Sequence, residues 1–176
     1  MTDSRAFEAA VLPCLDAGFN LARWLLRDEA AAEDAVQESV LRAMRYFKSL
    51  RAGDARPWFL GIVRNACFTQ LEGRRGRREE AGFDDEALGS LQLQAGLTAP
   101  DPAQAVQRGR DRERIDAAIR MLTPPLREVI VLREIEGLEY AEIAKIAAIP
   151  IGTVMSRLSR GRGRLKELLA PSGVGR

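Results

Sequence analysis

The sequence contains no histidine and only two cysteines among its 176 residues. Without histidine there is no Ser-His-Asp or Cys-His catalytic set and no metal site that uses imidazole ligands. Cys14 and Cys67 stand far apart in apolar surroundings with no CxxC motif, so we expect two buried thiols in a reducing compartment. Nucleophile–base pairs, metal-ligand sets and phosphate-binding loops are also missing from the sequence. We therefore expect no enzymatic activity, no cofactor and no metal.

Long apolar runs and export signals are missing as well. No run approaches the roughly 18 apolar residues that indicate a membrane-spanning helix. The N-terminus, MTDS, lacks the basic segment followed by an apolar one that marks a signal peptide. We expect a cytoplasmic protein without membrane insertion. Aromatic residues are few (6%), charged residues are many (30%), and no strand pattern is present, so we expect an all-α fold.

The small net charge of +2 hides a strong segregation of charge along the chain. The run RRGRR at 74–78 is basic, whereas residues 79–107 contain several acidic residues and neither lysine nor arginine. The C-terminal part, from about residue 157, is basic again. Segregation of this kind suggests a polyanionic partner that binds particular faces of the protein.

Residues 137–165 predict a helix-turn-helix motif. Apolar residues at helical spacing form a first helix, and Pro150 stops it because proline has no N–H group. A second helix begins near Gly152, with an apolar stripe of Val154, Leu158 and Leu165. Gly161 and Gly163 lower its helix propensity, so its last turns should either be held by packing or fray.

Polar groups on the outer side of the second helix indicate a nucleic-acid partner. Hydroxyl and guanidinium groups hydrogen-bond base edges and phosphates, and the start of such a helix enters the major groove. A solvated basic face on a C-terminal helix pair is the alternative, because basic amphipathic helices are common. The candidate residues are Thr153, Ser156, Arg157, Ser159 and Arg160.

Three further helices with large apolar faces are predicted near the N-terminus. They cover residues 5–26, with a kink or split near Pro13, then 28–47 and 57–71. In the second of them we expect Leu41 and Met44 to face inward. These helices form a first domain over residues 1–78.

The remaining chain divides into a linker, a second helical domain and a tail. Residues 79–107 are acidic and rich in glycine and proline, and a loop this long argues for two domains. The second domain covers residues 108–170, with Thr123 as the N-cap of one helix and Gly137 as its terminator. Residues 171–176 form the tail.

Three segments of the chain together resemble one known family. They are EDAVQE at 33–38 followed by LRA at 41–43; PWFLGIVRNA at 57–66; and LREV at 126–129 continuing to IGTV at 151–154 and SRL at 156–158. In this order and spacing they resemble the bacterial RNA polymerase sigma-70 family, specifically its small extracytoplasmic-function (ECF) group. The resemblance covers most of the chain and implies two helical domains joined by a linker.

The resemblance implies roles for residues of the first domain. Asn65 would contact an unstacked base of the −10 element, and the loop around Leu50 would help form the pocket for that base. Many relatives carry an aromatic residue near Leu50, so the pocket of this chain would read a different base. Residues that would follow phosphates near the −10 element are Arg74, Arg75, Arg77 and Arg78. Those that would contact the β′ clamp of core RNA polymerase are Asp34, Gln37 and Glu38.

Ordinary structural roles, without a partner, also fit these residues. An acidic helix stripe and a basic turn are ordinary solvated surfaces, and Asn65 suits any polar helix position. Trp58 belongs more naturally to the core than to a base-stacking platform, because its neighbours are apolar.

In the second domain the resemblance implies contacts with the −35 element. Arg133 would join Thr153, Ser156, Arg157, Ser159 and Arg160 in holding it. Met155 stands where relatives often carry a basic residue, which indicates a different −35 preference. The linker would thread the RNA exit path of the polymerase, and the second domain would meet its β flap. Relatives are commonly held inactive by an anti-sigma factor, so we expect such a partner, with the protein monomeric when free or in a 1:1 complex.

The resulting hypothesis is a sigma factor that binds core polymerase, directs it to −35 and −10 promoter elements and assists opening. Its main rival is a dimeric helix-turn-helix repressor or activator without sigma activity, which would leave the first domain without a role. A third possibility is a protein-binding adaptor, such as a decoy for an anti-sigma factor.

Overall fold

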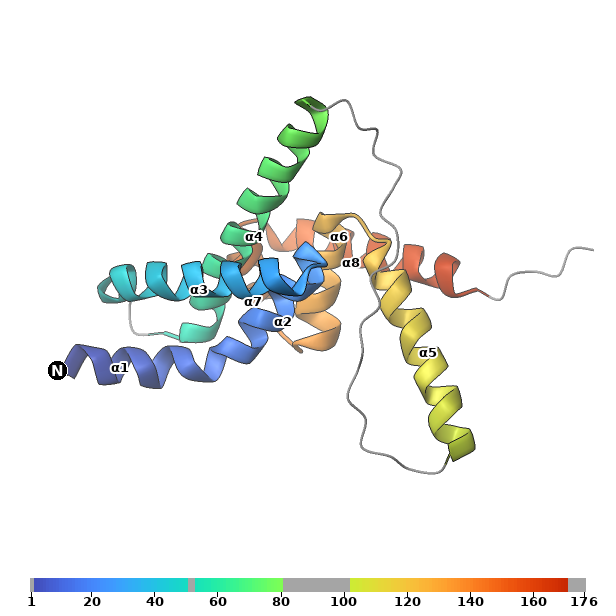
Figure 1. The fold of residues 1–176 in the computed structure, drawn as a ribbon, viewed down its shortest axis with the longest axis horizontal. Coiled ribbons are helices and arrows are strands. Elements are labelled where there is room, and N and C mark those ends of the chain that lie inside the picture. Colours follow the sequence, from blue (N-terminus) through green and yellow to red (C-terminus); the bar gives the residue numbers. More distant parts are fainter. Residues whose placement is uncertain (1, 51–52, 81–101, 171–176) are drawn as a thin grey trace, which may run out of the picture.

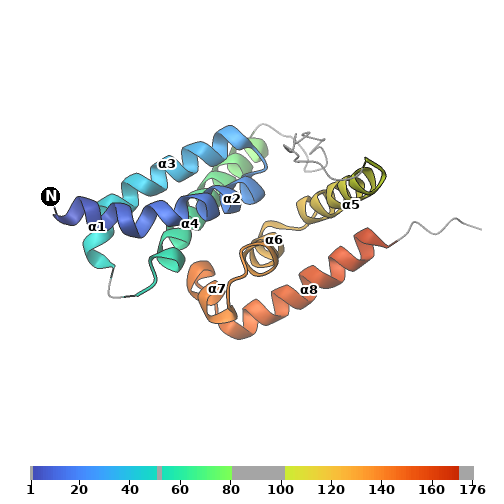
Figure 2. The same cartoon turned by 90° about the horizontal axis from the view of Figure 1, so that it is seen from below.

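The computed structural model describes residues 2–50, 53–80 and 102–170, and side chains within 4–50, 53–77 and 109–170 (Figures 1 and 2). Throughout these ranges the chain folds into helices and forms no strand, so the expected all-α fold is confirmed. Most of the predicted linker and the tail lie outside the described residues. At the edges of that linker, residues 79–80 and 102–107 belong to helices.

The N-terminal half is a bundle built from α1 (Thr2–Val11), α2 (Leu15–Leu26), α3 (Glu29–Tyr46) and α4 (Ala55–Glu80). Pro13 lies in a short 3₁₀ turn, η1 (Leu12–Cys14), which splits the first predicted helix as expected. The Asp28 side chain caps α3, accepting a hydrogen bond of 2.9 Å from the Ala31 N–H. A second 3₁₀ turn, η2 (Phe47–Ser49), follows α3.

Two expectations for this bundle are wrong. Leu41 and Met44 are exposed, with 67% and 58% of their surface accessible, although both were expected to face inward. Alanines such as Ala35 and Ala43, both fully buried, form the inner face of α3 instead, because α3 packs close to α2 and α4. Helix α4 also runs well past its predicted end at residue 71 and projects from the bundle (Figure 1).

The C-terminal half contains α5 (Pro102–Arg120), α6 (Pro124–Ile130), α7 (Tyr140–Ala147) and α8 (Ile151–Leu169). Thr123 is the N-cap of α6, as predicted, and a π-helical segment, η3 (Val131–Ile135), continues α6. Gly137 follows with φ of +68°, a conformation that glycine adopts without strain. Helices α7 and α8, joined by a tight turn at Ala148 (φ +52°), form the predicted helix-turn-helix.

Gly161 explains how the glycine-containing end of α8 stays helical. It is buried against α6, and a Cβ atom built there would lie 2.8 Å from Ile130 Cγ1. Gly163, two residues later, has open space around its Cα. The last turns are therefore held by packing, which is one of the two outcomes that the sequence predicted.

Substituting these two glycines should change stability in opposite directions. Gly161→Ala should lower the free energy of unfolding by about 1 kcal/mol, because overpacking outweighs the gain in helix propensity. Gly163→Ala gains the propensity without a clash and should raise the free energy of unfolding by up to about 1 kcal/mol. Urea denaturation of both variants measures the difference. If Gly161→Ala were as stable as Gly163→Ala, the close packing of α8 on α6 would be contradicted.

The two halves of the chain pack against each other. Helix α4 lies along α7 and α2 contacts α6, so the second half sits beside the bundle (Figure 2). Buried residues from both halves join one continuous apolar cluster, including Leu21 and Phe59 from the first and Ile130 and Ile143 from the second. The relative placement of the halves, which the sequence left open, is thus a close association.

Both cysteines agree with the sequence analysis. Cys14 and Cys67 are free and buried. Burial raises the pKa of both thiols, that of Cys67 to about 12 with a further contribution from the charge of Glu128. Among the helices that the structure describes, none combines the length and apolar character needed to cross a membrane.

Candidate nucleic-acid interface

Helix α8 presents one buried and one exposed face. Val154, Leu158 and Gly161 are buried, on the side that packs against α6 and α7. Ser156, Ser159 and Arg160 are exposed on the other side. Thr153 is half-buried, and its carbonyl accepts a hydrogen bond of 3.0 Å from the Ser156 hydroxyl. The outer face of α8 is therefore open to a partner, with hydroxyl and guanidinium groups in its first three turns.

Arg157 and Arg133 are less available than the other proposed −35 residues. The Arg157 side chain is half-buried, with Nη1 3.9 Å from Oε2 of Glu128. Arg133 lies in η3, donates 2.8 Å to the Leu138 carbonyl and pairs with Glu139 at 3.1 Å. Its guanidinium also covers the ring of Tyr140, 5.1 Å from the ring centre. Arg133 thus stabilises the segment that leads into α7.

The proposed −10 residues lie along α4 and at the end of η2. Asn65 is exposed, and its Oδ1 accepts a hydrogen bond of 3.3 Å from Arg64. Leu50 is half-buried directly after η2. Arg75 and Arg77 are exposed and Arg74 is half-buried. The side chain of Arg78 lies outside the described residues.

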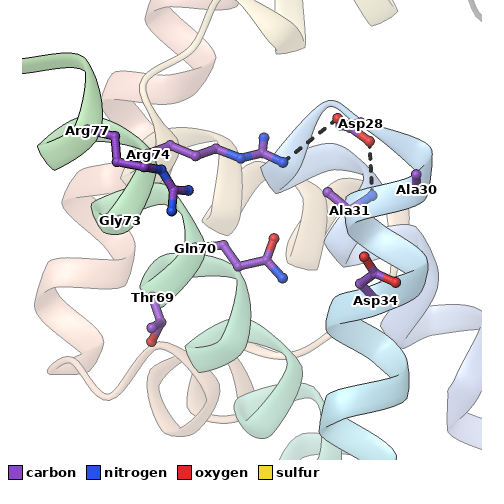
Figure 3. A pocket seen from close by; sticks show the side chains of 9 residues that line it. All are labelled: Asp28, Ala30, Ala31, Asp34, Thr69, Gln70, Gly73, Arg74 and Arg77. Atoms are coloured by element: carbon purple, nitrogen blue, oxygen red, sulfur yellow. Dashed lines mark hydrogen bonds and ion pairs between the residues drawn. The ribbon is translucent and has the colours of Figure 1, made fainter. Parts of the chain in front are cut away.

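A shallow depression of about 570 Å³ separates the start of α3 from the second half of α4 (Figure 3). Arg74 and Arg77 border it from α4, and Asp34 of α3 and its N-cap Asp28 border it from the other side. Gln70 points into the space between the two helices, while Arg74 reaches over to Asp28, at 3.8 Å. The structure therefore brings a proposed polymerase residue, Asp34, to the same surface as two proposed DNA residues.

The exposed side of α3 carries a continuous row that we call the α3 stripe. It begins with polar groups and ends with apolar ones; its members are Asp34, Gln37, Glu38, Leu41 and Met44, all exposed. Glu38 pairs with Arg42 at 2.5 Å. Sequence reasoning found the polar part and missed the apolar part, because leucine and methionine are usually buried. The alanine-rich opposite face of α3 was the available signal.

A charged cluster at the junction of the two halves was also missed. Glu128 of α6 is fully buried, and its Oε1 accepts a hydrogen bond of 2.6 Å from Arg64 Nε of α4. Its Oε2 has no hydrogen-bond partner and lies 3.9 Å from Arg157. Burial raises the pKa of Glu128, while Arg64 and Arg157 oppose that shift. One carboxylate therefore holds an arginine next to Asn65 and an arginine of α8 together.

Arg127, the neighbour of Glu128, is buried and donates to five backbone carbonyls. Burial and two nearby arginines lower its pKa to about 10. Each of its five donors is used, at 2.6 to 3.3 Å, and two of the bonds reach the first half of the chain. The acceptors are the carbonyls of Trp24, Leu25, Ile119, Arg120 and Leu122. Charged residues directly before an apolar run, as at 127–128, were the signal in the sequence.

Glu136 forms a third polar link between the halves. Its Oε1 accepts 2.5 Å from the Asn20 amide of α2, and its Oε2 pairs with Arg56 of α4 at 3.0 Å. Arg56 also donates to the Glu136 carbonyl at 3.2 Å. Apolar packing and three polar links, through Arg127, Glu128 and Glu136, therefore support the association of the halves.

In a comparison with known protein families, each half of the chain matches a family model. The model described as "Sigma-70 region 2" matches residues 14–77, and "Sigma-70, region 4" matches residues 112–165. The order of the two matches is that expected from the sequence motifs. Helix α3 and most of α4 fall in the first match, and most of the helix-turn-helix falls in the second.

Two relatives extend the comparison to most of the chain. The RNA polymerase sigma-H factor of Pseudomonas aeruginosa is 31% identical over 180 residues, covering 96% of this chain and 89% of that protein. The ECF RNA polymerase sigma factor SigE of Mycolicibacterium smegmatis is 34% identical over 155 residues. The match covers 88% of this chain but spans only 58% of the length of SigE. The chain belongs to the sigma-70 family, within its ECF group.

Solved structures agree with this assignment. The sigma factor RpoE from Bartonella quintana, in complex with the anti-sigma factor NepR, superimposes with a TM-score of 0.74 at 29% identity. The match covers 94% of this chain and 97% of RpoE. CnrH, in complex with the cytosolic domain of CnrY, shares the fold at 23% identity with a TM-score of 0.65, over 94% of this chain and 88% of CnrH. Sigma factors are transcription initiation factors and not enzymes.

Proposed function

We propose that the protein binds core RNA polymerase, directs it to a promoter with −35 and −10 elements, and assists opening of the −10 region. The observation that carries the proposal is the exposed hydroxyl and guanidinium face of α8, on a helix-turn-helix within a chain of this family. No covalent chemistry is required of the chain in this role.

Recognition of the −35 element falls to α8. Ser156, Ser159 and Arg160 are exposed and can meet base edges and phosphates when the start of α8 enters the major groove. Thr153 lies at the first turn, where a half-buried hydroxyl can reach a phosphate. Arg157 and Arg133 contribute after they leave their present carboxylate partners.

Opening of the −10 element falls to α4 and its surroundings. Asn65 would read a base that has left the stack, and Leu50 would line the pocket that receives it. Arg74, Arg75, Arg77 and Arg78 would follow the phosphates, so binding should weaken as salt is added. Neither half alone offers much base-reading surface, and we expect free protein to bind duplex promoter weakly until polymerase holds both halves at the promoter spacing.

The α3 stripe is the proposed polymerase-binding surface. Its polar end suits a basic partner helix, and its apolar end supplies the buried contact that usually dominates binding energy. The partner in polymerase would be the β′ clamp, with the second half meeting the β flap. Action on polymerase places the protein in the cytoplasm.

Two equally exposed side chains, one inside the α3 stripe and one outside it, should differ in their effect on polymerase binding. Leu41→Ala should weaken binding to core polymerase about tenfold, because burial of a leucine contributes about 1.5–3 kcal/mol. Met121 is also 67% exposed but lies at the end of α5, away from the stripe. Met121→Ala should leave the affinity unchanged. Fluorescence titration of core polymerase with labelled protein measures the affinity of each variant. Equal affinities for the two variants would show that Leu41 does not contact the polymerase.

An anti-sigma factor is the proposed inhibitory partner. RpoE from Bartonella quintana was solved in complex with the anti-sigma factor NepR. In this chain the exposed apolar residues of the α3 stripe are the surface that we expect it to cover. The free protein would be a monomer, and the inhibited form a 1:1 complex.

A further inference from the structure

Two apolar side chains at the start of α8 are not part of the buried core. Ile151 and Met155 are 47% and 55% exposed. A spacing of four residues places them on the same side of the helix, in a row that continues to Ser159. Packing of α8 uses a different stripe, which contains Val154 and Leu158. Exposed apolar groups on the helix that enters the groove therefore need another explanation.

The chemistry of the major groove offers one partner for such groups. Base edges there present hydrogen-bond donors and acceptors, and the single apolar group is the C5-methyl of thymine. The methionine side chain is long, flexible and polarizable, so it adapts well to an isolated methyl group. It offers no donor for guanine or adenine and no strong acceptor for cytosine.

We propose that Met155 is a specificity-determining residue, which reads a thymine methyl group in the −35 element, with Ile151 covering the contact from the preceding turn. This proposal rests on the proposed function and names one base pair that α8 requires. The neighbouring Ser156 and Ser159 hydroxyls, both exposed, then bind polar atoms on either side of that methyl group.

The test removes the methyl group from the DNA without altering any hydrogen bond. Holoenzyme formed with the full chain is bound to its selected promoter, in which each −35 thymine is replaced in turn by deoxyuridine. At one position the affinity of the wild-type holoenzyme should fall about fourfold, the effect of one buried methyl group. The Met155→Ala holoenzyme should show no loss at that position.

Two further variants sharpen the result. Met121→Ala, another exposed methionine that lies outside the helix-turn-helix, should keep the full sensitivity to deoxyuridine. Met155→Arg should change the preferred base at the same position to guanine in a selection experiment, because guanidinium binds guanine O6 and N7.

The outcomes separate this inference from the proposed function. Protein-dependent transcription with no thymine sensitive to deoxyuridine would overturn the role of Met155 alone. So would a loss that persists in Met155→Ala, which would assign the methyl contact to another residue. Absence of any protein-dependent transcription would instead overturn the proposed function, and the inference with it.

Discussion

Replacing Glu128 with alanine should lower the free energy of unfolding by about 3 kcal/mol and loosen the association of the two halves. Arg64 and Arg157, with only 19% and 22% of their side chains exposed, would keep their charges and lose the carboxylate between them. An arginine left without its partner in a partly buried site is strongly unfavourable. Urea denaturation measures the stability.

Two further variants test whether the loss of stability in Glu128→Ala comes from the buried charges. Glu134→Ala removes a carboxylate from an exposed pair with Arg162, and such pairs contribute less than about 1 kcal/mol. The double change Glu128→Leu with Arg64→Met removes the hydrogen-bonded pair of charges but leaves Arg157, so it should recover part of the lost stability. Equal stabilities for Glu128→Ala and Glu134→Ala would contradict the buried cluster.

Separation of the halves can be followed directly. Fluorophores placed at Glu33 of α3 and Lys166 of α8, both exposed, lie on different halves. Energy transfer between them should fall in Glu128→Ala and remain as in the wild type in Glu134→Ala. The same efficiency in both variants would show that apolar packing and the Arg127 and Glu136 links hold the halves together without Glu128.

Arg127→Met should lower the free energy of unfolding by about 3–5 kcal/mol, because each backbone carbonyl that Arg127 serves loses a charged donor. Methionine fills a similar volume, so the effect reports the hydrogen bonds more than a cavity. The bonds to the Trp24 and Leu25 carbonyls also stabilise the C-terminal end of α2, where no intrahelical N–H remains for them.

Arg45→Met is the matched control for that substitution. Arg45 lies on the exposed side of α3 near its end, where a surface change should alter stability by less than about 0.5 kcal/mol. Arg127→Lys keeps the charge but offers three donors from a single nitrogen, so it should recover only part of the loss. A fall of under 1 kcal/mol for Arg127→Met would mean that the five bonds are not maintained in solution.

The buried cluster also has a consequence for DNA binding. Arg64 adjoins Asn65, and Arg157 lies in the first turns of α8, so both arginines belong to surfaces proposed to meet the promoter. In the observed arrangement Glu128 occupies both. For Arg64 to bind a phosphate, its contact with Glu128 must break, and this contact joins the two halves. Arg157 lies in the same half as Glu128, so its release needs no separation of the halves.

Local signals made the helix-turn-helix predictable from the sequence. Pro150 cannot continue a helix, Gly137 accepts a positive φ, and Val154 and Leu158 mark the buried side of α8. Once that side was known, the outer face followed from helical geometry. The exposure of Ser156, Ser159 and Arg160 therefore agrees with the sequence analysis.

Features that depend on contacts distant in sequence were not predictable in this way. Arg64 and Glu128 are 64 positions apart, and no periodic pattern within either helix indicates that they meet. Leu41 and Met44 misled the prediction because residue type favours burial, whereas the alanines of α3 set its inner face. The end of α4 was predicted too early because Gly73 and Gly76 lower helix propensity without stopping the helix.

Run-off transcription with purified core polymerase, on a library of promoter-like DNA, tests the central claim most directly. We predict transcripts that depend on this protein and begin at defined positions, from templates sharing two short elements at a fixed spacing. Absence of such transcripts, together with tight binding of the free protein to palindromic duplex DNA, would contradict the sigma-factor role. That result would instead favour a dimeric repressor or activator.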